Sequence, residues 1–470
     1  MGGTKARSKL LIAAAAGLLS GVIPGAVGLP TKAALPGALT QSSCAGPPGW
    51  PTVGADLANT RNATGGPSPS QVASLSVLWR FHASDGDFTG TPVVGGCTVY
   101  VGSNGGWVRA LHENDGSLSW QTRLGGPIPS SAALDGGTVF VALANAGAPA
   151  VAALDASTGK VLWVTKIDAQ PDSDAYGSPI VYHGVVYEGV GGVVTSEVSS
   201  STISVRGALV ALDAKSGTVL WHTYTVPSGD DGGAIWSSPS IDPQTGLLYV
   251  GDGNAYHAPA APTTDSLLVF DSSSGQLVRY FQATGGDVFN GVNALTGPDL
   301  DFGASPNLLT LPSGVKAVGI GQKAGLYWMF RRSDLAPLWN SRVGLPDAFG
   351  GVIGSTAVDG SQVYGPNTLP GILWAVGQQT GQLAWLEPPL DPLHYGPASV
   401  SNGVVYSEDS YGFLDAVSAA TGLLLARMPL NPLLTTSYAQ AYGGVSIADG
   451  KLFADTGSQS TSGDVLAIGP

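Results

Sequence analysis

The chain has 470 residues, of which 68 are Gly and 33 are Pro, and its 20 basic and 33 acidic side chains give a net charge of −13. Because 43% of the residues are hydrophobic and only 11% are charged, the composition excludes a disordered chain, a coiled coil and a helical bundle for the bulk of the protein. The acidic balance without a basic run excludes nucleic acid as a partner, and two Cys exclude a disulfide scaffold.

The N-terminus has the pattern of a secretory signal peptide. Three basic residues precede an apolar run over 10–23, and small residues follow up to Gly28. A run of about 14 residues is short for a membrane span, and a membrane anchor is the alternative. We expect cleavage of residues 1–28, export to the periplasm, cell envelope or extracellular space, and no stable membrane span after cleavage. Residues 29–48 are rich in Ala, Pro, Gly and Ser, which predicts a flexible lead-in to a domain at 49–470.

The Cys and His residues form no known metal motif. Cys44 and Cys97 could pair in an oxidising compartment, and two separate thiols are the alternative. No two His have the spacing of metal ligands, so zinc is not expected. The glycines of 319–325 resemble a dinucleotide-binding loop, but a strand pattern follows them where that motif requires a helix.

From residue 79 onward, one structural unit repeats. An apolar strand ends in an acidic turn with Gly, and in most copies a Trp follows that Gly by four residues. The equivalent positions in eight copies are 79, 120, 163, 221, 279, 339, 385 and 426, where Arg279 and Ala426 replace Trp. They are spaced by 41 to 60 residues, with about four strands in each unit, which is typical of propeller blades.

These repeats predict an all-β fold, an eight-bladed β-propeller of four-stranded antiparallel blades. The strand of Trp79 stands alone at the start and the strand 464–468 stands alone at the end, so we expect the two to close the ring in one shared blade. The repeated Trp is expected to pack between blades and to be structural. The three longest intervals predict insertions at 188–207, 222–237 and 253–302, which should form loops on one rim.

The strand–turn–Trp unit resembles the pyrroloquinoline quinone (PQQ) repeat, and residues 50–61 resemble the opening of quinoprotein alcohol dehydrogenases. In order and spacing, four further blocks are similar to polyvinyl-alcohol-dehydrogenase-like quinoproteins: 234–243, 248–254, 297–303 and 321–325. The resemblance covers about residues 48–470 and includes no haem domain. It implies oxidation of an alcohol with PQQ and a bound calcium or lanthanide ion, with electrons leaving to a separate acceptor.

The resemblance also implies roles for residues around the cofactor. Trp236 matches the aromatic floor on which the quinone ring system stacks. Asp299 matches the base that removes the alcohol proton and is also a metal ligand, and Lys323 matches the cation that stabilises charge on the reacting quinone oxygen. Arg206 belongs to an Arg-Gly pair seen in relatives and could contact a cofactor carboxylate.

Three more residues are implied as metal ligands, with departures from the family pattern. Asn254 matches the amide ligand, and Asp301 matches the additional carboxylate of lanthanide-using variants. The family's other carboxylate ligand falls at Val194 without a gap, and Glu197 takes its place only with a gap of three residues. The adjacent Cys pair that covers the cofactor in many relatives is absent, and Ile353 stands where relatives have Trp.

Each implied role has a plainer alternative. Asp299 and Asp301 could form a solvated turn, Trp236 could belong to the core between blades, Asn254 could be a turn residue, and Lys323 could be an exposed cation. For the whole protein, the alternative is a non-catalytic PQQ-like propeller that binds proteins as an envelope-assembly scaffold. Convergence of these side chains near the propeller axis on one face would favour the enzyme.

Overall fold

The computed structural model describes residues 49–293, 299–348, 350–387, 393–430, 441–457 and 462–470. The predicted signal peptide, the predicted lead-in and Cys44 lie outside the described residues, so the expectations for them stay predictions. No helix within the described ranges is long and apolar enough to cross a membrane.

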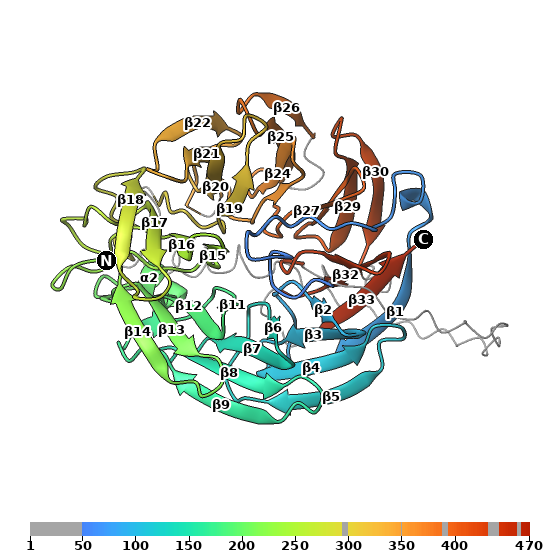
Figure 1. The fold of residues 1–470 in the computed structure, drawn as a ribbon, viewed down its shortest axis with the longest axis horizontal. Coiled ribbons are helices and arrows are strands. Elements are labelled where there is room, and N and C mark those ends of the chain that lie inside the picture. The colour runs from blue at the N-terminus through green and yellow to red at the C-terminus, as the bar shows by residue number, and fades with distance from the viewer. Residues whose placement is uncertain (1–48, 294–298, 349, 388–392, 431–440, 458–461) are drawn as a thin grey trace, which may run out of the picture. The chain divides into compact units, whose positions relative to one another are not determined.

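Eight antiparallel sheets stand around a ring as propeller blades (Figure 1). Blade 1 is β2 (Val93–Gly95), β3 (Thr98–Gly102), β4 (Trp107–His112), β5 (Leu118–Arg123), and blade 2 is β6 (Ala133–Asp135), β7 (Thr138–Leu143), β8 (Ala150–Asp155), β9 (Val161–Lys166). Blade 3 is β10 (Ser173–Asp174), β11 (Ile180–Tyr182), β12 (Val185–Gly192), β13 (Ala208–Asp213), β14 (Val219–Tyr224), and blade 4 is β15 (Ser240–Asp242), β16 (Leu247–Gly251), β17 (Ser266–Asp271), β18 (Leu277–Gln282).

The second half of the ring continues the pattern. Blade 5 is β19 (Asn307–Thr310), β20 (Lys316–Gln322), β21 (Leu326–Arg331), β22 (Pro337–Arg342), and blade 6 is β23 (Ala357–Val358), β24 (Gln362–Asn367), β25 (Ile372–Gly377), β26 (Leu383–Leu386). Blade 7 is β27 (Ser399–Ser401), β28 (Val404–Glu408), β29 (Phe413–Ser418), β30 (Leu424–Pro429), and blade 8 is β31 (Ser446–Ala448), β32 (Lys451–Asp455), β33 (Gly463–Gly469), β1 (Ser76–Ala83). Two short helices complete the described elements, η1 (Val72–Ser74) and α2 (Val194–Ser199).

Blade 8 closes the ring with strands from both ends of the described chain, as predicted. The outermost strand β1 pairs with β33, with Trp79 opposite Ala467, and Figure 1 shows the red β33 beside the blue β1. All seven residues of β33 are buried, because β1 and β32 flank it. The closure therefore hides two strand edges that would otherwise be unpaired.

Six tryptophans, the docking tryptophans, join each of six blades to the next: Trp79, Trp120, Trp163, Trp221, Trp339 and Trp385. Each indole Nε1 donates to a backbone carbonyl in the turn of the next blade, at 2.7 to 3.1 Å. The Gly of that turn has a positive φ and lies against the indole, so that a Cβ on Gly159 would be 2.4 Å from Trp120. The prediction that the repeated Trp packs between blades is confirmed. Arg279 makes the same contact by donating to the carbonyls of Arg332 and Ser333.

The predicted insertions need correction at their boundaries. Residues 188–192 continue β12 and residues 222–224 end β14, because both stretches still carry paired strand backbone. About a third of 253–302 is not a loop either, since 266–282 contain β17, β18 and the turn between them. The parts that do leave the sheets include α2 and the stretches before β15 and β19, and these supply most of the site described below.

Eight residues, the floor residues, lie four positions before the innermost strand of the eight blades: Thr89, Pro129, Tyr176, Trp236, Gly303, Ile353, Tyr395 and Tyr442. All eight line one axial chamber of about 160 Å³. Two positions further along, hydroxyl groups link consecutive blades: the Ser178 amide donates to Ser238 Oγ (2.9 Å), and the Ser238 amide donates to Ser305 Oγ (3.0 Å). The equal offset in every blade brings the floor residues together around the axis.

A crossing segment, residues 50–62, lies against the innermost strands on the far side of the floor residues. Its backbone hydrogen-bonds the second residue of the innermost strand in six blades: Val94, Leu134, Ile241, Leu308, Val358 and Val400. Each of these lies five positions after the floor residue of its blade. The segment therefore ties most of the ring together below the axial chamber.

Arg61 completes the crossing segment and is fully buried. Its guanidinium donates to the Ala398 carbonyl (2.7 Å) and Ser399 Oγ (3.0 Å) of blade 7, and to the Val445 carbonyl (3.4 Å) next to blade 8. Burial lowers the pKa of Arg61 to about 9, against the attraction of Glu408. The Arg61 cation, held mainly by neutral oxygens, therefore links blade 7 to blade 8, the blade that closes the ring.

Candidate functional site

A cavity of about 380 Å³ lies on the other side of the floor residues from the crossing segment. It shares Tyr176, Trp236, Ile353 and Tyr395 with the axial chamber, so these four side chains separate the two spaces. Six of the predicted site residues line the cavity together: Glu197, Trp236, Asn254, Asp299, Asp301 and Lys323. The structure thus brings together residues from α2 and from the segments that precede or follow the inner strands of blades 4 and 5.

Arg206 is not brought to the cavity with the others. Its guanidinium stacks on the ring of Tyr224, 3.5 Å from the ring centroid, and donates weakly to the Val226 carbonyl at 3.5 Å. Its backbone pairs with Gln170. These contacts hold it at the outer strand of blade 3, so an Arg-Gly pair in the sequence does not by itself place the cation near the axis.

Trp236 lies flat at the floor of the cavity. A Cβ on Gly303, in the next blade, would lie 2.0 Å from Cη2 of the indole, so the ring rests directly on that glycine. The indole Nε1 donates to Asp301 Oδ2 (3.1 Å), and Lys323 Nζ lies 5.1 Å from the ring centroid. The indole is therefore fixed by Gly303 and Asp301, and it lines the cavity as an aromatic surface with Lys323 beside it.

Lys323 forms a buried ion-pair set with two carboxylates. Its Nζ donates to Asp299 Oδ1 (2.7 Å) and to Asp301 Oδ2 (3.1 Å). Burial lowers the pKa of Lys323, but the carboxylates of Asp299, Asp301 and Glu197 outweigh burial and raise that pKa above its usual value. Lys323 is therefore a permanent cation over the floor of the cavity, and it is not an exposed lysine.

Asp301 connects the parts of the site. One carboxylate oxygen accepts the Asn254 backbone amide (2.9 Å), and the other accepts both Trp236 Nε1 and Lys323 Nζ. Its backbone carbonyl accepts the amide of Lys323 (2.9 Å). Burial and the Asp301 charge raise the pKa of Asp299 well above its usual value, against the opposing effect of Lys323. A raised pKa brings a carboxylate closer to the range in which a general base works at neutral pH.

The oxygen atoms of the cavity suit a hard cation. The Nδ2 group of Asn254 donates to the carbonyls of Ala255 (2.7 Å) and Phe289 (3.2 Å), which leaves Oδ1 as the group that can act as a ligand. Burial and the charge of Asp301 raise the pKa of Glu197 to about 8, against Lys323. Three carboxylates face one Lys among the described lining residues, so a multivalent cation would relieve their repulsion.

The rest of the wall suits a flat cofactor. Ala234, Phe289 and Ile353 add apolar surface around the indole, and Val194 and Val198 face the same space from α2. A cavity with an aromatic floor, an apolar wall and a few convergent charges is the usual form of a cofactor site. The residues present therefore fit both a planar quinone and an oxygen-bound metal ion.

Three contributors to the site were missed by the sequence analysis, namely Tyr176, Tyr395 and Gly303. Tyr176 lines the cavity, donates to Asp174 Oδ2 (3.0 Å) and accepts the Val194 amide (3.4 Å), so it anchors the start of α2. The available signal was their common position, four residues before each innermost strand. That offset is visible in the sequence only after the strands have been assigned.

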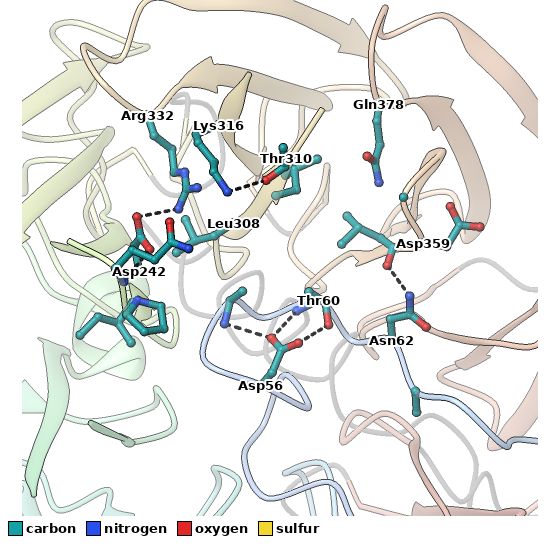
Figure 2. A pocket seen from close by; sticks show the side chains of 18 of the residues that line it. Asp56, Thr60, Asn62, Asp242, Leu308, Thr310, Lys316, Arg332, Asp359 and Gln378 are labelled. Carbon is teal, nitrogen blue, oxygen red and sulfur yellow. Dashed lines mark hydrogen bonds and ion pairs between the residues drawn. The ribbon is translucent and has the colours of Figure 1, made fainter. Parts of the chain in front are cut away.

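A larger depression of about 780 Å³ lies between the crossing segment and blades 4 to 6 (Figure 2). Its polar groups are paired with each other: Arg332 with Asp242 (2.9 Å), Lys316 with Thr310 Oγ1 (3.0 Å), and Asp56 with the Thr60 amide (3.1 Å). It contains none of the predicted site residues. The first pair joins blade 5 to blade 4, the second lies within blade 5 and the third lies within the crossing segment, as expected of a structural surface.

A buried group in blade 7 has the spacing of a metal site. Ligand atoms of His394, Asp409 and Asp415 lie within 4.8 Å of one another, which the sequence did not reveal. Arg427 forms ion pairs with both carboxylates. Its guanidinium supplies the positive charge that a cation would otherwise bring, so the group is a buried ion-pair network.

Comparisons with known proteins give matches in sequence and in fold. The profile of the family described as outer membrane protein assembly factor BamB matches residues 71–279. A polyvinylalcohol dehydrogenase of Pseudomonas sp is 31% identical, over 89% of this chain and 75% of the relative. Another, of Sphingopyxis sp. (strain 113P3), is 29% identical over 84% of this chain and 70% of the relative. The solved structure of a quinohemoprotein alcohol dehydrogenase from Pseudomonas putida HK5 has a TM-score of 0.74 at 18% identity, over 90% of this chain and 80% of that chain, and shares its fold.

Proposed function

This chain belongs to the polyvinylalcohol dehydrogenase family, and we propose that it is an exported dehydrogenase that oxidises an alcohol with PQQ and a bound metal ion. Electrons then pass to a separate acceptor. The observation that carries the proposal is the meeting of an aromatic floor, a permanent cation and three carboxylates in one cavity. Trp236, Lys323 and Asp299 are the residues on which the chemistry depends.

The proposed roles follow from the contacts of each side chain. PQQ, when bound, supplies the acceptor for the hydride of the alcohol. The Asp299 carboxylate takes the hydroxyl proton, and Lys323 Nζ, 2.7 Å from Asp299 Oδ1, stabilises negative charge beside it. Trp236 orients the ring system by stacking.

Glu197, Asn254 and Asp299 are the proposed ligands of the cation, which is calcium or a lanthanide. Asp301 adds a further carboxylate at the same place, and its orientation is set by three donors. Because attraction scales with charge, an added carboxylate favours a trivalent ion over a divalent one. We therefore expect a lanthanide to support binding better than calcium.

Direct titration tests the proposal. PQQ added in the tens of micromolar range, with calcium or a light lanthanide, should quench tryptophan fluorescence and support dye-linked oxidation of an alcohol. EDTA should remove binding, because anionic PQQ would then face three carboxylates and one Lys. No quenching and no dye reduction with either metal would reject the proposed function.

The alternative, a protein-binding scaffold, is supported by the match to the assembly-factor profile. That match ends at residue 279, before Asp299, Asp301 and Lys323. A scaffold would have no need for a buried lysine between two buried carboxylates in the 380 Å³ cavity. The enzyme is therefore the better-supported proposal.

A further inference from the structure

Gly303 occupies a special position among the floor residues. It follows Trp236 by one blade and has no side chain, whereas the other seven floor positions carry one. The indole of Trp236 fills the space where a side chain at 303 would lie. Blade 5 therefore has no side chain at its floor position, and the indole of Trp236 from blade 4 extends over that position.

The glycine is needed for space and not for backbone conformation. A Cβ at 303 would lie 2.0, 2.5 and 2.8 Å from Cη2, Cζ2 and Cζ3 of Trp236, closer than any real contact. Gly303 is not among the glycines with positive φ, so alanine can adopt its backbone. The steric demand therefore comes from the indole, which would have to move away from Gly303 and into the cavity.

We propose that Gly303 is a positioning residue for the cofactor platform, an inference that rests on the proposed function. It lets Trp236 lie flat while Nε1 reaches Asp301 Oδ2 at 3.1 Å. A side chain at 303 tilts the indole, narrows the space above it and pulls Nε1 away from Asp301. Asp301 also holds the Asn254 amide and Lys323, so the displacement spreads to the proposed ligand and to the cation.

Gly365 provides a matched control. It also lacks a positive φ, and a Cβ there would lie 2.5 Å from Cζ2 of Trp374, a fully buried tryptophan. Trp374 does not line the cavity. Gly303→Ala and Gly365→Ala therefore both crowd an indole, but only the first crowds the proposed platform. Gly365→Ala should lose at least as much melting temperature, because Trp374 has no cavity to move into, while only Gly303→Ala loses PQQ affinity, by about tenfold.

Rescue by a smaller ring tests the steric cause. Phe lacks the outer atoms of the indole that lie over Gly303, so Trp236→Phe should recover much of the PQQ affinity in the Gly303→Ala background. In the wild-type background the same change should weaken binding. Affinities of the four proteins, measured by calorimetry with PQQ and a lanthanide, form a double-mutant cycle with a clear coupling.

A readout without PQQ separates this inference from the proposed function. In protein labelled with 4-fluorotryptophan, the ¹⁹F resonance of Trp236 is assigned by its loss in Trp236→Phe. It should shift in Gly303→Ala and stay in place in Gly365→Ala. An unmoved resonance, or a moved resonance with unchanged PQQ affinity, overturns the positioning role. If the wild type binds no PQQ, the proposed function fails, and a shifted resonance would then show that Gly303 orients Trp236 for some other purpose, which also overturns this inference.

Discussion

The docking tryptophans on the outer strands and Trp236 near the axis make the same kind of contact, an indole packed on a glycine, at two distances from the propeller axis. In both places an indole rests on a glycine of the next blade. On the outer strands, the indole N–H donates to a neutral backbone carbonyl, as Trp120 does to Ala156 (2.9 Å). At the floor, the indole N–H donates to the carboxylate of Asp301 instead.

The difference teaches that the partner of the indole decides its role. An outer glycine such as Gly159 has a positive φ and makes the turn, so that glycine serves backbone and packing together. Gly303 serves packing alone and leaves one face of Trp236 on a cavity. Outer contacts hold blades together, whereas the inner contact presents a surface.

Deleting residues 463–470 is expected to have the largest effect, because the outer contacts depend on a closed ring. The deletion removes β33, exposes β1 and β32, and takes Trp79 from its place over Gly116. Loss of its buried apolar side chains alone costs at least about 6 kcal/mol. A thermal melt should show a large fall or no cooperative transition, and removing Pro470 alone should change little. An unchanged melting temperature would contradict closure through β33.

Trp120→Ala should separate the outer contact from the site. Losing an indole that is packed on Gly159 and bonded to Ala156 should cost about 3 kcal/mol of unfolding free energy. PQQ affinity should stay within about twofold of wild type, because Trp120 is on the outer strand of blade 1 and does not line the cavity. Denaturant unfolding and PQQ titration check the two parts. Lost affinity in a protein that still folds would break the distinction between outer and inner tryptophans.

Asp299→Ala should act in the opposite way, on activity and not on stability. Without its proposed base, the enzyme should lose dye-linked alcohol oxidation by about a hundredfold or more. Asp155→Ala is the control, since Asp155 hydrogen-bonds Ser157 and Thr158 in an outer turn. That variant should keep full turnover. Equal turnover of Asp299→Ala and wild type would remove Asp299 from the mechanism.

Trp236→Ala has the smallest expected free-energy effect of the four. Stacking contributes about 1 kcal/mol beyond buried area, so PQQ affinity should fall by roughly fivefold or more. The main spectroscopic change is that PQQ-dependent quenching from this indole disappears while the melting curve is retained. Difference spectra against wild type measure it. Full quenching in the variant would show that another tryptophan is the platform.

The fold could be predicted because its signals are local and repeated. In four copies a turn glycine lies four residues before a docking tryptophan, and eight copies of the whole unit define the ring. The ends of the insertions could not be predicted in the same way: residues 188–192 and 266–282 pair with neighbouring strands, and pairing depends on contacts outside the segment.

The site was predictable only residue by residue, through the resemblance. Trp236, Asp299 and Lys323 meet in the cavity, and α2 brings Glu197 there although the alignment needed a gap to reach it. Arg206 does not meet them, because its stacking on Tyr224 depends on β14. The role of Gly303 was out of reach, since a missing side chain has meaning only once the neighbouring blade is in place.

The crossing segment also has a consequence for the order in which the molecule can form. Arg61 and Ala398 are hydrogen-bonded although 337 residues separate them along the chain. A ribosome therefore completes nearly the whole polypeptide before these early residues find their partners, and such distant pairings slow folding. The part of the domain that is synthesised first is thus the last to form its hydrogen bonds.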